Sequence, residues 1–240
     1  MNAGVGGQFA AAILSENALG FAAVIPDIKC VSPKEGDLLR GRDPVDTAKY
    51  LVLEAGAPLL SVVTERENFG GSPELLRSVV RAVGVPVLRK DFIKNTDMLE
   101  ETAGLGAAAV LLISSTTDVA TLKLLYEKSI ELGLEPLVET HTAEEMAFAR
   151  SLGARLIGVN NRDIASLELD AGGPERTRAL AGGAPKDALL ISESGIMSPE
   201  GAAIAAAAGA HAVLVGTALW RAADMGAFYR SLRVERRYHS

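Results

Sequence analysis

The sequence repeats a short pattern in which a Gly-Ala pair separates a helix-forming stretch from an apolar run. Glycine in this position commonly adopts the left-handed conformation that ends a helix, and the apolar run that follows is typical of a buried strand. A chain that repeats helix, glycine and strand consists of βα units, which build parallel sheets. The pattern occurs at Ala55-Gly56-Ala57, Leu105-Gly106-Ala107, Leu152-Gly153-Ala154 and Ala208-Gly209-Ala210.

Eight apolar runs have the length of strands, and helical stretches lie between them. Asp43 is placed to cap a helix over Pro44–Ala55, and Asp118–Leu132 carries apolar residues at helical spacing. Eight such pairs predict a (β/α)8 TIM barrel, which takes about 250 residues as a single domain. A doubly wound open sheet is the alternative, although it more often shows a glycine fingerprint after its first strand. The predicted strands are Val24–Cys30, Leu59–Thr64, Val87–Lys90, Ala109–Ile113, Glu135–Glu139, Leu156–Asn160, Ala188–Glu193 and Ala212–Gly216.

The barrel is expected to occupy residues 24–232 of the 240-residue chain. Residues 1–23 begin with glycine and alanine and become mildly amphipathic over Phe9–Leu19, which predicts a short lead-in helix that covers one end of the barrel. Residues 233–240 are expected to form a frayed C-terminal tail.

The composition excludes several classes of protein. A formal net charge of −6 with acids and bases scattered along the chain argues against a nucleic-acid partner, because phosphate backbones require a basic patch. Cys30 is the single cysteine, so no internal disulfide and no cysteine-based metal site are expected. The apolar stretch Phe9–Leu14 lacks a basic start and is too short to span a membrane. These features predict a cytoplasmic protein without metal or membrane partner, as a monomer or weak homo-oligomer.

Polar residues stand where the predicted strands end. Active sites of such barrels lie at the carboxyl ends of the strands, so these side chains are candidates for function. Strand alternation places Asp27 and Lys29 on one face, with Cys30 directed at the helices as a buried structural thiol. A ring of salt bridges that only satisfies the rim is the alternative. The candidates are Asp27, Lys29, Lys90, Glu139, Asn160, Arg162, Glu193 and Ser194.

Two glycine-containing pairs predict a phosphate site. Ser194-Gly195 follows the seventh strand and Gly216-Thr217 follows the eighth. The loops after these two strands commonly bind phosphate through backbone N–H groups, and glycine allows the anion to approach closely. Ordinary turns are the alternative explanation. Any phosphate bound here is expected to belong to a small molecule.

Five segments, in the same order, resemble the strand-end motifs of the indole-3-glycerol-phosphate synthase family. Phe69-Gly70-Gly71-Ser72 after the second strand and Val215-Gly216 on the eighth extend the resemblance from about Val24 to the last helix. The combination of Arg-Lys-Asp-Phe with Ser-Glu-Ser-Gly about a hundred residues later is specific. The five segments are Asp27-Ile28-Lys29-Cys30-Val31-Ser32-Pro33, Val87-Leu88-Arg89-Lys90-Asp91-Phe92-Ile93, Leu137-Val138-Glu139, Ile157-Gly158-Val159-Asn160-Asn161-Arg162 and Ser192-Glu193-Ser194-Gly195-Ile196.

The resemblance implies that the substrate is 1-(2-carboxyphenylamino)-1-deoxyribulose 5-phosphate, which is closed to an indole with loss of carbon dioxide and water, in tryptophan biosynthesis. It implies Lys90 as the acid beside the ketose carbonyl during ring closure. It leaves Glu139 and Lys29 as the candidates for the acid and base of the later steps, and leaves open which lysine acts at which step. No metal or organic cofactor is implied.

The same resemblance implies positions for the remaining candidates. Glu193 and Asn160 would orient the lysines and the sugar hydroxyls, and Asp27 would hold Lys29. Polar and anionic parts of the substrate would contact Ser32, Arg162 and Ser194. The aromatic ring would lie between Phe69 and Phe92, and the phosphate would bind backbone groups of Gly195, Gly216 and Thr217.

The chain departs from the family in two places. Asp27 stands where the family usually has glutamate, so its carboxylate is one methylene shorter, and the lead-in is shorter than the family's. Two other functions are therefore kept open. One is an isomerase of the phosphoribosylanthranilate type that uses Asp27 opposite Glu139. The other is a barrel that has lost its chemistry and binds a phosphorylated ligand.

Overall fold

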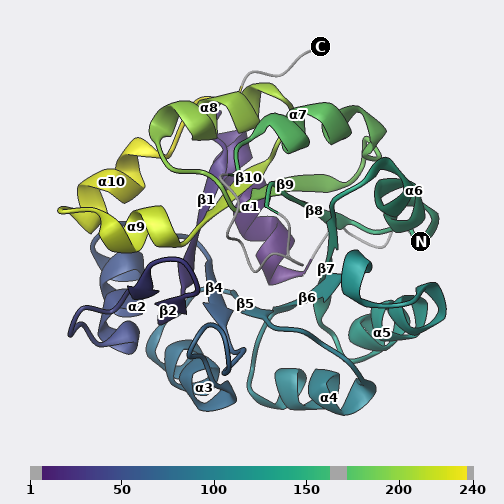
Figure 1. Ribbon diagram of the computed structural model, residues 1–240, viewed down its shortest axis with the longest axis horizontal. Helices are drawn as coiled ribbons and strands as arrows, with labels where there is room; N and C mark the ends of the chain where they lie inside the picture. The colour runs from purple at the N-terminus through teal and green to yellow at the C-terminus, as the bar shows by residue number, and fades with distance from the viewer. Residues whose placement is uncertain (1–6, 163–171, 237–240) are drawn as a thin grey trace.

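Eight parallel strands close into a barrel in the computed structural model, which describes residues 7–162 and 172–236 (Figure 1). Going round the barrel, the strand order is β1-β10-β9-β8-β7-β6-β5-β4. The predicted (β/α)8 barrel is therefore confirmed, and the open sheet is wrong. The strands are β1 (Ala23–Ile28), β4 (Leu60–Val63), β5 (Val87–Lys90), β6 (Ala109–Ile113), β7 (Glu135–Thr140), β8 (Leu156–Asn160), β9 (Leu189–Glu193) and β10 (Ala212–Val215).

Strands β5, β6 and β8 have the predicted bounds, and the other five differ from the prediction by one or two residues at their ends. Strand β1 ends at Ile28 rather than Cys30, because the chain turns there toward a small antiparallel pair, β2 (Val31–Ser32) and β3 (Gly36–Asp37). Strand β7 continues to Thr140, which pairs with Val159 of β8.

Helices surround the barrel and begin at the caps that the sequence indicates. The Asp43 side chain accepts hydrogen bonds from the first-turn N–H groups of α2, and Asp118 does the same for α5. The helices are α1 (Gln8–Ala18), α2 (Pro44–Leu53), α3 (Pro73–Ala82), α4 (Thr96–Gly104), α5 (Val119–Glu131), α6 (Ala143–Ser151), α7 (Glu175–Leu180), α8 (Pro199–Ala207), α9 (Thr217–Arg221) and α10 (Met225–Ser231), with 3-10 turns η1 (Ser114–Thr116) and η3 (Ala181–Gly183).

The glycines of the repeated Gly-Ala pattern act as helix ends. Gly56, Gly106, Gly153 and Gly209 all have positive φ, between 70° and 106°. An alanine at these positions would be strained, so glycine is required where each helix turns into the next strand.

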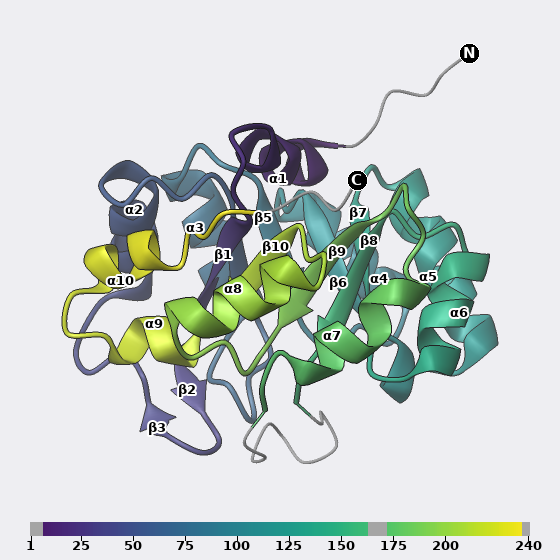
Figure 2. The same cartoon turned by 90° about the horizontal axis from the view of Figure 1, so that it is seen from above.

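Helix α1 lies across the amino end of the barrel, on the side opposite to β2 and β3 (Figure 2). Phe9 and Ile13 are fully buried and pack with Ile25, Leu88 and other barrel residues. The N–H groups of Phe9 and Ala10 donate to the two carboxylate oxygens of Glu135, at 2.6 and 2.9 Å. This end of the barrel is therefore closed by apolar packing and by a capped helix.

Residues 233–236 pack against the end of α1. The Arg236 N–H donates to the Gly20 carbonyl at 2.8 Å, and Glu235 forms a β-bridge with Phe21. The expectation of a frayed tail is wrong for these four residues, because backbone hydrogen bonds hold them. Residues 237–240 of the expected tail lie outside the described residues.

Cys30 is buried and forms no disulfide. Burial, with a smaller contribution from the nearby Asp37 carboxylate, raises the pKa of its thiol. A thiol that resists ionisation is a poor nucleophile, which agrees with a structural role. Among the described helices, none combines the length and the hydrophobicity needed to cross a membrane.

Candidate active site

Two adjoining hollows open at the carboxyl ends of the strands. The first encloses about 370 Å³ including its open mouth, and it is formed mainly at the ends of β8, β9 and β10. Eight of the residues that the sequence predicts to act in catalysis, substrate binding or phosphate binding lie in its wall. They are Asp27, Lys29, Lys90, Arg162, Ser194, Gly195, Gly216 and Thr217.

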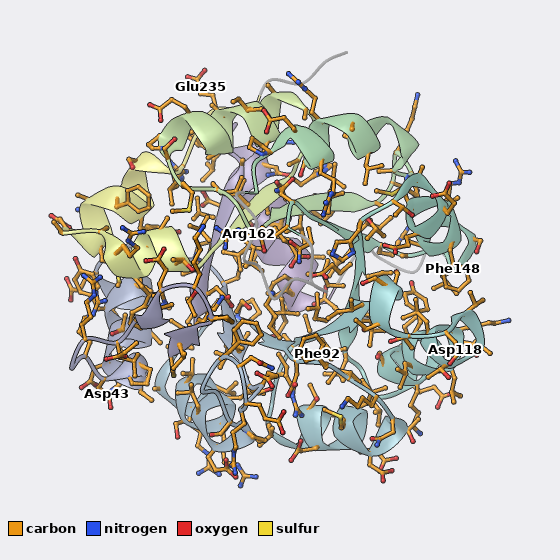
Figure 3. The ribbon with its side chains drawn as sticks, in the orientation of Figure 1. Asp43, Phe92, Asp118, Phe148, Arg162 and Glu235 are labelled. Carbon is orange, nitrogen blue, oxygen red and sulfur yellow. The ribbon has the colours of Figure 1, made fainter. Side chains whose placement is uncertain are left out.

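The second hollow encloses about 340 Å³ and has a more apolar wall. Phe69 and Phe92, both predicted to flank an aromatic ring, lie in it together with Leu111 and Ile113. Such a wall suits a flat apolar group, because aromatic and aliphatic side chains exclude water from it. Figure 3 shows Phe92 and Arg162 inside the ring of helices, whereas Asp43, Asp118, Phe148 and Glu235 lie toward the outside of the molecule.

Asp27, Lys29 and Lys90 line both hollows and so form the partition between them. Asp27 and Lys29 share one face, as strand alternation predicts, and Lys90 ends β5 opposite Val63 of β4. The Lys29 ammonium lies 4.6 Å from the centroid of the Phe69 ring, within reach of a cation–π interaction. Asp27 is 4% exposed, and its Oδ1 atom accepts no hydrogen bond from the described residues.

Glu139 and Glu193 lie below the hollows, in the barrel interior. Both are fully buried, on β7 and β9 respectively. They meet across β8, where Gly158 pairs with Glu139 and Asn160 pairs with Glu193. A Cβ atom added to Gly158 would overlap the Glu193 carboxylate, so glycine makes room for that side chain. The two glutamates therefore approach the hollows from beneath rather than from the rim.

Asn160 and Arg162 are fixed to one another at the end of β8. The Arg162 N–H donates to the Asn160 Oδ1 atom at 3.0 Å. Arg176, which the sequence reasoning missed, donates from Nη1 to the carbonyls of both residues, at 2.8 and 2.9 Å. Only Arg162 lines a hollow, whereas Asn160 is fully buried. No local pattern could have identified Arg176, because the contact joins α7 to the end of β8.

The loop after β9 has an unusual backbone. Ser194 and Gly195 both have positive φ, 60° and 68°, and an ordinary side chain such as that of serine is strained there. The Asn161 Nδ2 group stabilises this loop by donating to the carbonyls of Glu193 and Ser194 at 2.9 and 3.0 Å. Asn161 was part of a quoted motif, but the sequence reasoning assigned no role to it.

Gly216 and Thr217 begin the short helix α9 beside Asp27. A Cβ atom added to Gly216 would lie 3.3 Å from the Cβ and Oδ2 atoms of Asp27. The Trp220 indole N–H of the same helix donates to the Asp27 carbonyl at 2.9 Å. Strand β1 and helix α9 are thereby held together at the predicted phosphate-binding loop.

Ser32 is the predicted substrate-binding residue that the structure places apart. It lies on β2, is 3% exposed and lines neither hollow. The chain leaves the barrel after Ile28, so alternation along β1 does not extend to Ser32.

An ion-pair cluster lies next to the mouth, centred on the buried Arg89 rather than on Lys90. Arg89 is 2% exposed and contacts Glu101 at 2.7 Å and Asp91 at 3.1 Å. The other Asp91 oxygen accepts from the Phe92 N–H at 2.8 Å. The cluster therefore fixes the segment that carries Lys90 and Phe92, although the sequence reasoning assigned no role to Arg89.

His141 is another residue that the sequence reasoning missed. It follows β7 directly, and its ring lies 3.5 Å from Glu139 and 3.4 Å from Glu145. Its position two residues after Glu139 was the available signal. Within residues 7–162 and 172–236, no group of three or more His, Cys, Asp or Glu side chains is arranged to hold a metal ion.

Comparisons with known proteins agree with this geometry. The family model of indole-3-glycerol phosphate synthase matches residues 7–232. The chain is 42% identical to the indole-3-glycerol phosphate synthase of Carboxydothermus hydrogenoformans, over 90% of this chain and 80% of that protein. It is 43% identical to that of Thermococcus kodakarensis, over 88% of this chain and 91% of that protein.

A solved structure supports the fold independently. The thiamine phosphate pyrophosphorylase of Pyrococcus furiosus matches with a TM-score of 0.63 over 88% of this chain and 93% of that one. At 15% sequence identity, this likeness concerns the barrel architecture alone. The family match over nearly the whole chain, with relatives above 40% identity, is decisive: the chain belongs to the indole-3-glycerol phosphate synthase family.

Proposed function

We propose that this chain closes the indole ring of 1-(2-carboxyphenylamino)-1-deoxyribulose 5-phosphate, with release of carbon dioxide and water. The observation that carries the proposal is that Asp27, Lys29 and Lys90 stand between two hollows and line both of them. One hollow has an apolar wall, and the other is lined by glycines. The substrate has the same three-part order, because its ketose lies between an aromatic ring and a phosphate.

The first step forms the carbon–carbon bond of the new ring. The aromatic carbon that bears the carboxylate attacks the ketose carbonyl carbon, and Lys90 donates a proton to the carbonyl oxygen as negative charge develops there. The bond to the carboxylate then breaks, its electron pair restores the aromatic ring, and carbon dioxide leaves. Phe69 and Phe92 flank the aromatic ring and fix its position during this step.

The second step removes water. An acid protonates the hydroxyl group on the new ring, and a base takes a proton from the neighbouring ring carbon, so that a double bond forms as water leaves. Lys29 and Glu139 supply the acid and the base. Asp27 is assigned to hold Lys29, and Glu193 to orient the lysines.

The remaining residues hold the substrate. Backbone N–H groups of Gly195, Gly216 and Thr217 bind the phosphate in the first hollow. The other polar contacts are assigned to Arg162 and Ser194, which line that hollow, and Asn160 orients Arg162 from beneath.

The test is to mix the purified full-length chain with the anthranilate sugar phosphate and to follow indole fluorescence and carbon dioxide together. Equal amounts of both products are expected. Binding without turnover would favour a barrel that has lost its chemistry. Turnover of phosphoribosylanthranilate instead would favour the isomerase, and no binding of either compound would overturn the proposal.

A further inference from the structure

His141 lies between two carboxylates at the carboxyl end of β7. Its Nε2 atom is 3.5 Å from Oε1 of Glu139, and its Nδ1 atom is 3.4 Å from Oε2 of Glu145. The side chain is 10% exposed. These distances are those of ion pairs rather than of short hydrogen bonds.

Glu139 needs a partner of this kind. It is fully buried, and neither carboxylate oxygen accepts a hydrogen bond from the described residues. A buried carboxylate is costly without a charged or hydrogen-bonding neighbour, and such a neighbour also fixes its orientation. In the described part of the chain, His141 is the basic side chain within ion-pair distance of Glu139.

Glu145 holds His141 from the opposite side. It stands in the first turn of α6, and its carboxylate accepts the His141 backbone N–H at 2.6 Å. Burial by itself would raise the pKa of Glu145, but hydrogen bonds and the charge of His141 outweigh it, and the pKa lies below its ordinary value. Glu145 thereby holds the ring from its Nδ1 side, and the Nε2 atom faces Glu139.

We infer that His141 is a positioning residue, which orients the Glu139 carboxylate for its part in the second step. This inference rests on the proposed function, in which Glu139 is an acid or base. His141 lines neither hollow, so it acts through Glu139 and not on the substrate.

A purely structural role for His141 is the competing explanation. Its backbone N–H already ties the β7–α6 turn to Glu145. That backbone bond is retained whatever side chain stands at position 141. Substitution of the ring therefore separates the effect on Glu139 from the effect on the turn.

The test is a double-mutant cycle on His141→Ala and Glu139→Gln. Alone, His141→Ala should lower kcat about tenfold and change KM less than about threefold. In the Glu139→Gln background it should change kcat less than about twofold, because the carboxylate that it orients is gone. His141→Gln should recover part of the lost rate, since its amide can still donate to Glu139.

Two acidic neighbours in the first turn of α6 provide a matched control. Glu145→Gln should lower kcat about threefold through His141, whereas Glu144→Gln should not, because Glu144 is exposed and has no contact with the ring. Equal losses of kcat from His141→Ala in both backgrounds, or a loss of thermal stability alone, would overturn the inference.

An inactive wild-type chain would sink the proposed function without deciding the role of His141. In that case the unfolding free energies of the wild type, the two single variants and the double variant are measured in denaturant and compared. Non-additive values would show that His141 and Glu139 interact in the folded state, and additive values would show that they do not.

Discussion

Strand β7 carries one glutamate at each end of the barrel, and the two are held in opposite ways. At the amino end, both oxygens of Glu135 accept backbone N–H groups of α1. At the carboxyl end, Glu139 is fully buried, yet neither of its oxygens accepts a hydrogen bond from the described residues. A carboxylate whose oxygens accept backbone N–H groups holds two elements of the fold together, whereas one without hydrogen bonds leaves its oxygens available for other contacts.

The surroundings of the two glutamates differ in the same sense. Phe9 and Ile13 fill the amino end with apolar side chains, while Lys29 and Lys90 stand over the carboxyl end. The comparison teaches that one end of the barrel is built for stability and the other for chemistry. Substitutions at the two ends should therefore change different measured quantities.

The largest effect is expected at the mouth, from Lys90→Ala. Loss of the proposed general acid should lower kcat by about a hundredfold or more, with little change in the unfolding free energy. The measurement is indole fluorescence under saturating substrate. Lys94→Ala, four residues further along and exposed, is the matched control and should retain the wild-type rate. An unchanged rate in Lys90→Ala would contradict the proposed mechanism.

Phe9→Ala, at the amino end, should lower the unfolding free energy and leave catalysis unchanged. Removal of this fully buried ring leaves a cavity and should lower the unfolding free energy by about 3 to 5 kcal/mol in denaturant titrations. Under conditions where the variant remains folded, kcat and KM should match the wild type. Leu19→Ala, at a site that is 65% exposed, should change stability by less than about 0.5 kcal/mol. A loss of kcat in folded Phe9→Ala would break the contrast between the ends.

His211, also near the amino end, should make stability depend on pH. Burial, and secondarily the Arg236 charge, lowers its pKa from 6.5 to about 4, and the Leu190 N–H donates to its Nδ1 atom. Between these pH values the unfolded chain binds a proton that the folded chain does not, so this contribution is complete above about pH 6.5 and is lost as pH falls toward 4. Its loss at pH 5 is about 2 kcal/mol.

Comparison of wild type with His211→Gln isolates this contribution. Unfolding free energies measured at pH 7 and pH 5 should fall more steeply for the wild type than for the variant. The slopes, rather than the absolute values, are compared, because the substitution also removes a hydrogen bond. Equal slopes would show that His211 has the same proton affinity in both states.

The smallest effect is expected from Gly216→Ala at the phosphate-binding loop. Gly216 has a φ of −111°, which alanine accepts, but the added Cβ would lie 3.3 Å from Asp27 and narrow the first hollow. We expect KM and the inhibition constant of inorganic phosphate to rise about tenfold, with kcat within about threefold. Gly182→Ala, where no atom lies within 4 Å of the added Cβ, should change neither constant. An unchanged inhibition constant of phosphate in Gly216→Ala would show that the phosphate does not bind at this loop.

Gly195→Ala is a less direct test of the same site. Gly195 has a φ of +68°, and an added Cβ would meet the backbone N of Gly173 at 2.7 Å. Its variant should therefore lose stability as well as affinity, so a rise in KM there would not by itself identify the phosphate site.

The sequence by itself determined the architecture and the residues at the strand ends. Helix caps such as Asp43, helix-ending glycines such as Gly56 and the apolar runs all depend on local backbone geometry and short-range spacing. The same local alternation placed Asp27 and Lys29 on one face, and the structure brings both to the two hollows.

Only the tertiary structure decided which of these residues meet. Strand register across the closed barrel places Glu139 and Glu193 on either side of Gly158, beneath the hollows. Because β1 ends at Ile28 and the chain turns there, Ser32 does not line either hollow. The contact of His141 with Glu139 likewise depends on how the turn into α6 folds back over β7. Contacts of this kind depend on strand register, barrel closure and loop path, which periodicity along a single strand does not specify.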